Sequence, residues 1–395
     1  MSKVLVTGIG IISPLGFSIN ENREALKNGV CALNSLAFTQ SKYASLLPFG
    51  EVKVSNEDLR QKHSISDRGV TRTTLLALDA FKQAVADAQL NANDLENART
   101  AFINGTTVGG MCASDFLYQD ANFSEVGSEY LNSYDLGSVA LFIQKKFGIK
   151  GITNTFNTAC SSSANAIMYG ARLLQHGLAE RVIVGGVDSL AKFTINGFNS
   201  LNILSNEICR PFDVARKGLN LGEGAAFLVL EKEENCRHKK VYAEVSGYAN
   251  TNDAFHPSSL SDEGEGPYLA MTKALKVAKI NAEQVSFVNT HGTGTENNDE
   301  AESRAMLRVF GNVPPFASTK SNIGHTLGAA GAIEATFCLL NILHQEVYPA
   351  LHFDTPIETT QLIPVLKYRK AEINHVMSNS FGFGGNCSSL VFSKI

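Results

Sequence analysis

The sequence has no Cys-x-x-Cys pair, no excess of basic residues and no apolar run of the ~20 residues that a membrane span needs. The seven cysteines are scattered singly, which argues against a disulfide framework and favours a reduced, cytoplasmic setting. None of the nine histidines has a partner at helical spacing and no Cys/His cluster forms a ligand set, so we expect no metal. The net charge of −4 gives no support for nucleic-acid binding.

What the sequence does contain is a regular alternation of apolar strand-like runs with alanine-rich helical segments. This order indicates an α/β layered architecture. The predicted strands cover residues 3–12, 100–104, 181–187, 225–230, 241–249 and 285–289. Helical spacing places two apolar sets on single faces, Leu75, Leu78, Phe81, Val85 and Ala88 in one helix and Ala164, Ile167, Ala171 and Leu174 in another. A further helix is predicted over residues 268–279, after a surface loop at 256–267.

The order of elements restarts near residue 241. Residues 89–95 resemble residues 279–285, and each segment leads into a strand and a Gly/Thr loop. This similarity predicts two duplicated halves, residues 1–240 and 241–395, with Cys160 and His325 at equivalent strand-to-helix corners. Chance similarity between short segments is the alternative.

Cys160 differs from the other cysteines because it lies where a strand-like run turns into a helix. The helix dipole favours a thiolate there, and a pKa below the usual value of about 8.5 would make Cys160 a nucleophile near neutral pH. The other cysteines are interpreted as small core residues. Cys387 is a rival nucleophile, ranked lower because no helix begins after it.

Two histidines follow strand-like runs among small residues. His291 opens the sequence His-Gly-Thr-Gly-Thr, and His325 lies five residues after Lys320, before a Gly/Ala-rich helix. Two neutral imidazoles can each donate one N–H to a single developing enolate oxygen. A third Gly-rich segment, residues 379–387, is either a simple hairpin loop or a loop whose backbone N–H groups face a bound carbonyl.

These segments resemble the β-ketoacyl-acyl-carrier-protein synthases of the long-chain elongating type, within the thiolase-like superfamily. The similarity runs from residue 4 to residue 392 and includes the motifs at 210–213, 221–226 and 328–334. The resemblance implies a thiolase-like α/β/α/β/α five-layer fold from two duplicated halves, no cofactor and a homodimer. It also implies an acyltransferase that condenses an acyl-enzyme thioester with malonyl-carrier to give a 3-oxoacyl product, as in fatty acid elongation.

The resemblance assigns roles residue by residue. Cys160 holds the acyl chain, while His291 and His325 support decarboxylation and bind the enolate. Lys320 and Glu334 support the site electrostatically. The resemblance implies that the backbone N–H groups of Cys160 and Phe383 form the oxyanion hole, and that the Phe383 side chain is the gate. It places Phe381 in the substrate-binding wall and Val108 in the acyl pocket. The residues implied to contact the pantetheine arm are Ser258, Thr293 and Thr295.

Two segments depart from the family pattern. Asn386 and Cys387 stand where a Thr-Asn pair is usual, which leaves the shape of the loop and the acyl preference open. Residues 110–134 match poorly, and in such synthases this region contributes to the dimer interface and to the partner's acyl pocket. The acyl chain length is therefore open.

The partner implied by the resemblance is an acidic acyl carrier protein, for which Arg68, Arg72 and Arg210 are docking candidates.

Three alternative functions stay open. The same reaction could serve a polyketide or aryl polyene pathway in a heterodimer, the chain could be a binding subunit that shapes a partner's pocket, or it could be a non-decarboxylative thiolase. Against the binding subunit stand four intact residues: Cys160, His291, Lys320 and His325.

Overall fold

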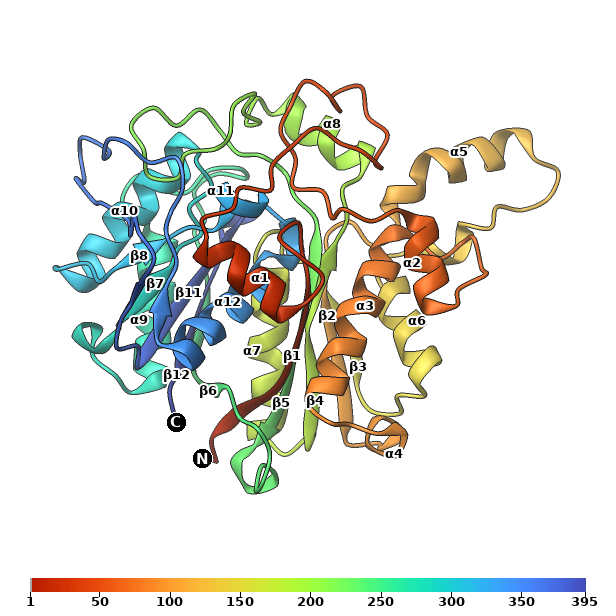
Figure 1. The fold of residues 1–395 in the computed structure, drawn as a ribbon, viewed down its shortest axis with the longest axis horizontal. Coiled ribbons are helices and arrows are strands. Elements are labelled where there is room, and N and C mark those ends of the chain that lie inside the picture. Colours follow the sequence, from red (N-terminus) through yellow and green to blue (C-terminus); the bar gives the residue numbers. More distant parts are fainter. Residues whose placement is uncertain (1) are drawn as a thin grey trace.

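The computed structural model describes residues 2–395, and a mixed ten-stranded sheet forms its framework (Figure 1). The strands of this sheet are β1 (Val4–Ile12), β2 (Thr100–Gly105), β3 (Thr153–Phe156), β4 (Arg181–Asp188), β5 (Gly224–Lys232), β6 (Ala243–Asn252), β7 (Phe287–Asn289), β8 (Phe316–Ala317), β11 (His375–Gly382) and β12 (Asn386–Ser393). A separate two-stranded sheet pairs β9 (Glu346–Val347) with β10 (Arg369–Lys370).

The strand order repeats. The sheet reads β3-β2-β4-β5-β1 and then β6-β12-β11-β7-β8. When the strands of the large sheet are numbered within each half in chain order, and each half is read from its outer edge to the centre, both halves have the order 3-2-4-5-1. The pairing directions repeat as well, with β2 parallel to β3 and β4 in one half, and β7 parallel to β8 and β11 in the other. The halves join where β1 and β6 pair antiparallel at Leu5–Glu244 and Val6–Ala243.

Helices cover and separate the two half-sheets. The α-helices are α1 (Ile19–Lys27), α2 (Asn56–His63), α3 (Arg72–Asp87), α4 (Ala92–Glu96), α5 (Ser114–Phe123), α6 (Ser138–Phe147), α7 (Ser162–Gln175), α8 (Lys192–Ser200), α9 (Glu265–Ala278), α10 (Glu296–Phe310), α11 (Lys320–Ile323) and α12 (Ala330–His344). Short 3₁₀ turns cover Met111–Ala113, Leu131–Ser133, Glu233–Asn235, Ala282–Gln284, Leu327–Ala329 and Phe383–Gly385. Helix α3 packs on one outer face, α7 and α12 pack together in the middle, and α9 packs on the other outer face. These layers confirm the predicted α/β/α/β/α fold.

The central helices approach closely because small residues face each other. A Cβ on Gly331 of α12 would lie 2.7 Å from the backbone nitrogen of Ala164 in α7. Every residue of α12 from Ala330 to Ile342 is buried. The segment Leu327–His344 is long and apolar enough to cross a membrane by length and composition, but 89% of it is buried inside the protein. It is the core helix of this fold.

Most predicted elements are confirmed, with one correction. The predicted surface loop at residues 256–267 ends earlier than expected, because α9 begins at Glu265. The poorly matching segment 110–134 contains α5, none of whose residues is buried. Figure 1 shows α5 projecting from the body of the molecule.

Candidate active site

Cys160, the predicted nucleophile, lies on a tight turn between β3 and α7. Ala159, just before Cys160, has a φ of +52°, in the left-handed region that costs a non-glycine residue about 1–2 kcal/mol. Hydrogen bonds hold the turn: the Thr158 N–H donates to Ser162 Oγ at 2.9 Å, and Ser161 Oγ donates to the Thr158 carbonyl at 2.8 Å. The turn therefore holds Cys160 directly before the first residues of α7.

His325 occupies the equivalent corner of the second half. It follows α11 and Gly324, whose φ of +76° lets the chain turn after the short helix. The His325 N–H donates to the carbonyl of Asn220 at 2.7 Å, and the His325 carbonyl accepts from the Gly222 N–H at 2.9 Å. A segment of the first half thus fixes the backbone of His325.

His291 lies in the loop after β7, and two buried carboxylates of α10 hold that loop. Glu302 accepts from the backbone N–H groups of His291 at 2.9 Å and Gly292 at 2.8 Å. Asp299 accepts from the N–H of Thr293 at 2.9 Å. The sequence reasoning missed both carboxylates; their signal is a pair of acidic residues three apart, shortly after the His-Gly-Thr-Gly-Thr motif.

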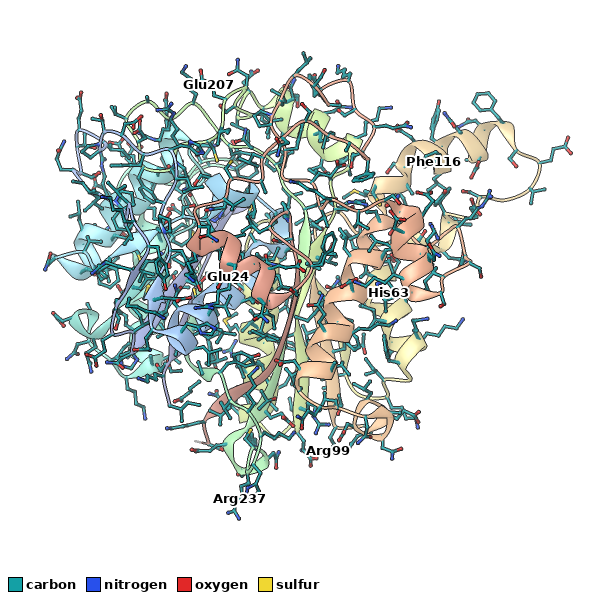
Figure 2. The ribbon with its side chains drawn as sticks, viewed as in Figure 1. Glu24, His63, Arg99, Phe116, Glu207 and Arg237 are labelled. Carbon is teal, nitrogen blue, oxygen red and sulfur yellow. The ribbon has the colours of Figure 1, made fainter. Side chains whose placement is uncertain are left out.

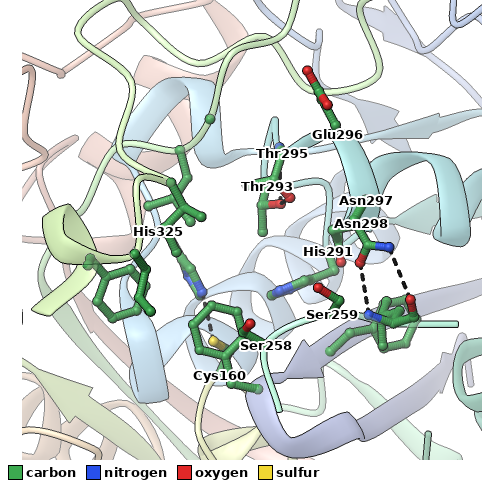
Figure 3. A pocket seen from close by; sticks show the side chains of 18 of the residues that line it. Cys160, Ser258, Ser259, His291, Thr293, Thr295, Glu296, Asn297, Asn298 and His325 are labelled. Carbon is green, nitrogen blue, oxygen red and sulfur yellow. Dashed lines mark hydrogen bonds between the residues drawn. The ribbon is translucent and has the colours of Figure 1, made fainter. Parts of the chain in front are cut away.

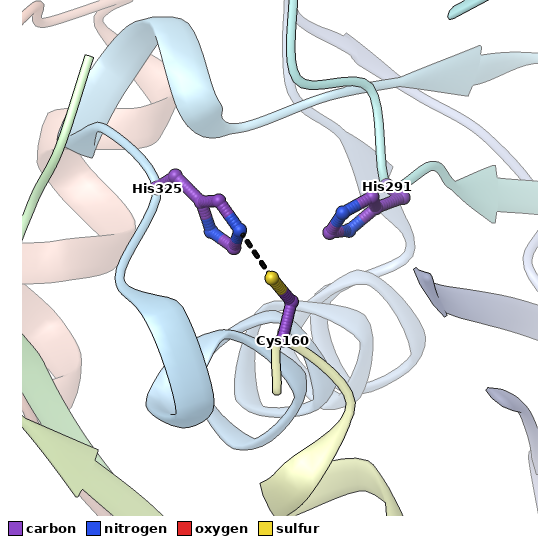
Figure 4. A group of neighbouring side chains, drawn as sticks. All are labelled: Cys160, His291 and His325. Atoms are coloured by element: carbon purple, nitrogen blue, oxygen red, sulfur yellow. Dashed lines mark hydrogen bonds between the residues drawn. The ribbon is translucent and has the colours of Figure 1, made fainter. Parts of the chain in front are cut away.

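The three side chains meet although they come from distant segments (Figure 4). Cys160 Sγ lies 2.9 Å from His325 Nε2. The rings of His291 and His325 have centroids 5.3 Å apart and lie nearly perpendicular, at 84°. The sulfur of Cys160 and one ring nitrogen of each histidine all lie within 4.8 Å of one another. The sequence shows no Cys/His cluster because these three residues are far apart in the chain, and the fold brings them together.

Burial dominates the electrostatics of this group. Burial raises the pKa of Cys160 to about 11, against the smaller lowering effects of the Lys320 charge and of the backbone N–H groups of Phe383 and Cys160 itself. The expected low pKa of the Cys160 thiol is therefore wrong. Burial and the Lys320 charge lower the pKa values of His291 and His325 well below the usual range, so both imidazoles are neutral at pH 7.

Lys320 and Glu334 form a buried ion pair behind the histidines. Lys320 Nζ lies 2.6 Å from Glu334 Oε1, and both side chains are almost fully buried. The attraction between the two charges offsets part of the cost of burying them, and burial still raises the pKa of Glu334. The pair brings a fixed positive charge close to all three side chains, as its effect on their pKa values shows.

A cavity of about 470 Å³ leads to the three side chains (Figure 3). Of the residues predicted from the sequence, its wall contains Cys160, Ser258, His291, Thr293, Thr295, His325, Phe381 and Phe383. Thr293 and Thr295 share a hydrogen bond of 2.9 Å between their hydroxyls. Lys320 and Glu334 lie outside the wall. Val108 also lies outside it, in a hydrophobic cluster with Leu219, which does line the cavity.

Two phenylalanines of the Gly-rich segment lie on different sides of the cavity. Phe381 lies beside His291, with ring centroids 5.8 Å apart. Phe383 stacks on Phe198 of α8, with centroids 5.8 Å apart and ring planes 20° apart. Gly382 between them packs closely on the nucleophile turn, since a Cβ there would lie 2.8 Å from the Thr158 carbonyl oxygen.

Asn386, singled out as a departure from the family pattern, ties the Gly-rich segment to the nucleophile turn. Its Oδ1 accepts from Ser161 Oγ at 2.8 Å, Asn165 Nδ2 at 3.0 Å and Asn250 Nδ2 at 2.6 Å. Cys387 is buried in a hydrophobic cluster with Phe381, and burial raises its pKa. The structure therefore gives Asn386 a positioning contact and keeps Cys387 out of the cavity wall.

The arginines proposed for carrier docking lie in different environments. Arg72 is buried and its guanidinium contacts Glu223 at 2.5 Å, so its proposed docking role is wrong. The positive charge of Arg72 pairs with the buried carboxylate of Glu223. The positions of these two residues in the sequence give no sign of this ion pair. Arg210 is half-exposed and lies 2.9 Å from Asp354, whereas Arg68 is exposed.

A buried cysteine between two neutral imidazoles, at the centre of a duplicated five-layer fold, defines a thiolase-like enzyme with a covalent thiol mechanism. Comparison with known protein families shows which family of thiolase-like enzymes this is. Residues 1–235 match the N-terminal domain of β-ketoacyl synthase, and residues 242–354 match its C-terminal domain. The chain therefore belongs to the β-ketoacyl synthase family, the acyltransferases that elongate chains by Claisen condensation.

Relatives from several organisms match along their whole length. The chain is 34% identical to 3-oxoacyl-[acyl-carrier-protein] synthase 2 of Staphylococcus aureus, covering 99% of this chain and 98% of the relative. It is 30% identical to the mitochondrial 3-oxoacyl-[acyl-carrier-protein] synthase of Arabidopsis thaliana, covering 100% and 93%.

Two solved structures extend the similarity to assemblies. The ishigamide ketosynthase/chain length factor matches with a TM-score of 0.93 at 27% identity, covering 100% of this chain and 99% of the other. The ketosynthase ApeO, in complex with its chain length factor ApeC from Xenorhabdus doucetiae, matches with a TM-score of 0.89 at 30% identity, covering 100% and 98%.

Proposed function

We propose that this enzyme is a cytoplasmic condensing enzyme that loads an acyl group from an acyl carrier protein onto Cys160 and extends it with malonyl-carrier. The contact of 2.9 Å between Cys160 Sγ and His325 Nε2, at the end of a cavity that also contains His291, carries this proposal. The Lys320–Glu334 pair supports the two histidines electrostatically.

In the loading step, Cys160 Sγ attacks the acyl thioester carbonyl and passes its proton to His325 Nε2. Because the thiol is protonated at neutral pH, this transfer must accompany attack. The oxyanion accepts hydrogen bonds from the backbone N–H groups of Cys160 and Phe383, which already face the sulfur. The carbon–sulfur bond of the incoming thioester breaks, and the departing carrier thiolate takes the proton from His325.

In the condensing step, the malonyl group loses carbon dioxide and its electrons form an enolate. Neutral His291 and His325 each donate one N–H to the enolate oxygen. Neither Nδ1 atom has a hydrogen-bond partner among the described residues, and the contact of His325 Nε2 with the Cys160 thiol is lost when Cys160 is acylated, so no contact then fixes the tautomer of either ring. His325 can therefore accept at Nε2 during loading and donate there during condensation. The enolate carbon attacks the acyl carbon, the bond to Cys160 breaks, and the sulfur leaves as a thiolate that takes up a proton from solvent.

The walls of the cavity suit a carrier-linked substrate. Hydroxyls of Ser258, Thr293 and Thr295 line it and can bond the amides of a pantetheine arm. Phe383 closes one side by stacking on Phe198 and, with glycines on both sides, has room to swing as a gate. We assign the acyl pocket to the cluster around Val108, behind Leu219.

The working form is proposed to be a dimer. Helix α5 and the segment after it expose large apolar side chains, among them Phe116, Tyr118 and Phe123, on an arm that leaves the body (Figures 1 and 2). We propose that the arm packs against a second copy of this chain. A chain length factor, as in the two ketosynthase assemblies, is the heterodimeric alternative. Arg68 and Arg210 are proposed to contact the carrier protein.

A condensation assay tests the function. Purified enzyme is incubated with malonyl-carrier and acyl-carriers of different length, including an aromatic starter, and products are identified by mass spectrometry. We expect a 3-oxoacyl product from wild type and none from Cys160→Ala. Exclusive use of the aromatic starter would place the enzyme in a specialised polyketide or aryl polyene pathway. Condensation of acetyl-thioesters without malonyl-carrier and without release of carbon dioxide would contradict the proposal.

A further inference from the structure

The three side chains at the end of the cavity also form a set of metal ligands. One donor atom each from Cys160, His291 and His325 lies within 4.8 Å of the other two, and all three side chains are buried. Figure 4 shows the sulfur between the two imidazoles. A thiolate with two imidazoles is a donor set that suits Zn²⁺.

The charges around the three ligands allow a metal. A ligating thiol must be deprotonated, so metal binding releases one proton to solvent. The positive charge of Lys320 opposes a cation, but Glu334 lies 2.6 Å from it and offsets much of that repulsion.

The distances require only a small adjustment. Tetrahedral Zn²⁺ with bonds of about 2.3 Å to sulfur and about 2.0 Å to nitrogen separates its ligand atoms by roughly 3.5 Å. The pair Cys160 Sγ and His325 Nε2 must widen from 2.9 Å, while no donor is more than 4.8 Å from another. The fourth position faces the cavity, which these three residues line, and a water molecule can fill it.

The surroundings indicate reversible capture rather than a resident metal. A ligating histidine almost always donates its second N–H to a carboxylate, carbonyl or water, which strengthens binding. Neither His291 Nδ1 nor His325 Nδ1 has such a partner among the described residues. A metal at this site would also occupy the sulfur that the reaction needs.

We propose that Cys160, His291 and His325 reversibly bind a single Zn²⁺ when no acyl group is on Cys160, and that this binding inhibits the enzyme. Binding follows Zn²⁺ + Cys–SH → Cys–S–Zn⁺ + H⁺, with no change in oxidation state. Acyl loading and metal binding exclude each other because they use the same sulfur atom. The ligand geometry carries the metal site independently of the condensation reaction, and only the inhibition rests on the proposed function.

Binding is measured first, without turnover. The purified enzyme is titrated with Co²⁺ as a spectroscopic substitute and with Zn²⁺ in equilibrium dialysis. We expect a thiolate-to-cobalt charge-transfer band that Zn²⁺ removes. The band should be lost in Cys160→Ala and weakened in His291→Ala. It should be unchanged in the matched control Cys31→Ala, whose thiol is half-buried and lies outside the cavity wall. A band that persists in Cys160→Ala would overturn the proposal.

Protection of the thiol is measured next. At a Zn²⁺ concentration about ten times the dissociation constant, the free thiol falls about elevenfold, so alkylation of Cys160 by iodoacetamide should slow about tenfold. A chelator should restore the rate. Unchanged alkylation would overturn the metal site. If the metal protects the thiol in an enzyme that performs no condensation, the proposed function fails and the metal site stands.

Discussion

At the residue scale, the properties of Cys160 depend on burial more than on its place in the sequence. The sequence predicts the strand-to-helix corner correctly, because small residues and a helical stripe around position 160 are local patterns. It predicts the wrong direction for the thiol pKa, because desolvation comes from residues far away in sequence. Arg72 is also predicted wrongly for this reason, because the residue that it pairs with in the interior, Glu223, is far away in sequence.

The pH dependence of thiol alkylation tests the raised pKa. A thiol with a pKa of about 11 is protonated at neutral pH and loses its proton only as the pH rises toward that value. We therefore expect the alkylation rate of Cys160 in the empty enzyme to keep rising from pH 7 to pH 10. The rate is measured by peptide mass spectrometry with short exposures to iodoacetamide. A plateau at or below pH 8 would show a thiolate stabilised at neutral pH instead.

Asn386 is a second residue whose contribution can be measured. Asn386→Leu removes the acceptor of three hydrogen bonds and leaves buried donors of Ser161 and Asn165 without this partner. We expect kcat to fall about tenfold, which corresponds to about 1.4 kcal/mol, with a smaller change in KM. Asn386→Asp keeps the acceptor and should retain more of the wild-type rate. Equal losses in both variants would contradict a positioning role.

At the element scale, the sequence predicts most strands and helices, and the misses fall where tertiary contacts decide the structure. The loop after β7 is predicted from its glycines and threonines. Its anchors Asp299 and Glu302 are missed, because their contacts form only when α10 folds back on the loop. The left-handed Ala159 is likewise missed, since nothing in its residue type favours a positive φ.

The buried carboxylate of Glu346 links β9 to α1 and β10. Glu346 of β9 accepts from Arg23 of α1 at 2.7 Å, from Tyr348 and Tyr368 at 2.9 Å, and from Lys370 of β10. Burial alone would raise its pKa, but these hydrogen bonds lower it to about 2. The folded pKa therefore lies below the ordinary value of 4.5, so the ionised carboxylate stabilises the fold above about pH 4.5.

Glu346→Gln tests this link through the free energy of unfolding in urea. A shift from 4.5 to about 2 corresponds to about 3 kcal/mol at pH 7, which is lost as the pH falls from about 4.5 to about 2. We expect the stability difference between wild type and Glu346→Gln to be about 3 kcal/mol at pH 7 and roughly half of that at pH 3. A difference that is constant with pH would count against the ionic contribution.

At the scale of the whole molecule, the repeated strand order explains why two distant segments build one site. The matching junctions at residues 89–95 and 279–285 predict a duplication, and the order 3-2-4-5-1 in both halves shows it in the topology. Equivalent corners then bring Cys160 and His325 together across α7 and α12. The residue pattern of 110–134 does not predict that α5 projects from the body, although the resemblance assigns part of a dimer interface to this segment.

The arm provides the test of assembly. Phe116 and Phe123 have 53% and 85% of their surface exposed, and covering them in a dimer is worth about 1 kcal/mol and about 2 kcal/mol respectively. We expect light scattering to give a dimer for wild type and a monomer for the double variant Phe116→Glu/Phe123→Glu. Lys273→Glu, on α9 and away from the arm, is the matched control for added charge. A wild-type protein that is monomeric in the absence of a second gene product would favour the heterodimer.

The central claim is that one sulfur atom carries the acyl chain between loading and condensation. The direct measurement incubates the enzyme with acyl-carrier alone, determines the mass of the Cys160 peptide, and then adds malonyl-carrier. The account predicts an acyl adduct on Cys160 that disappears on the second addition as an equal amount of 3-oxoacyl-carrier forms. Condensation at the wild-type rate by Cys160→Ala, or an adduct that malonyl-carrier does not discharge, would contradict it.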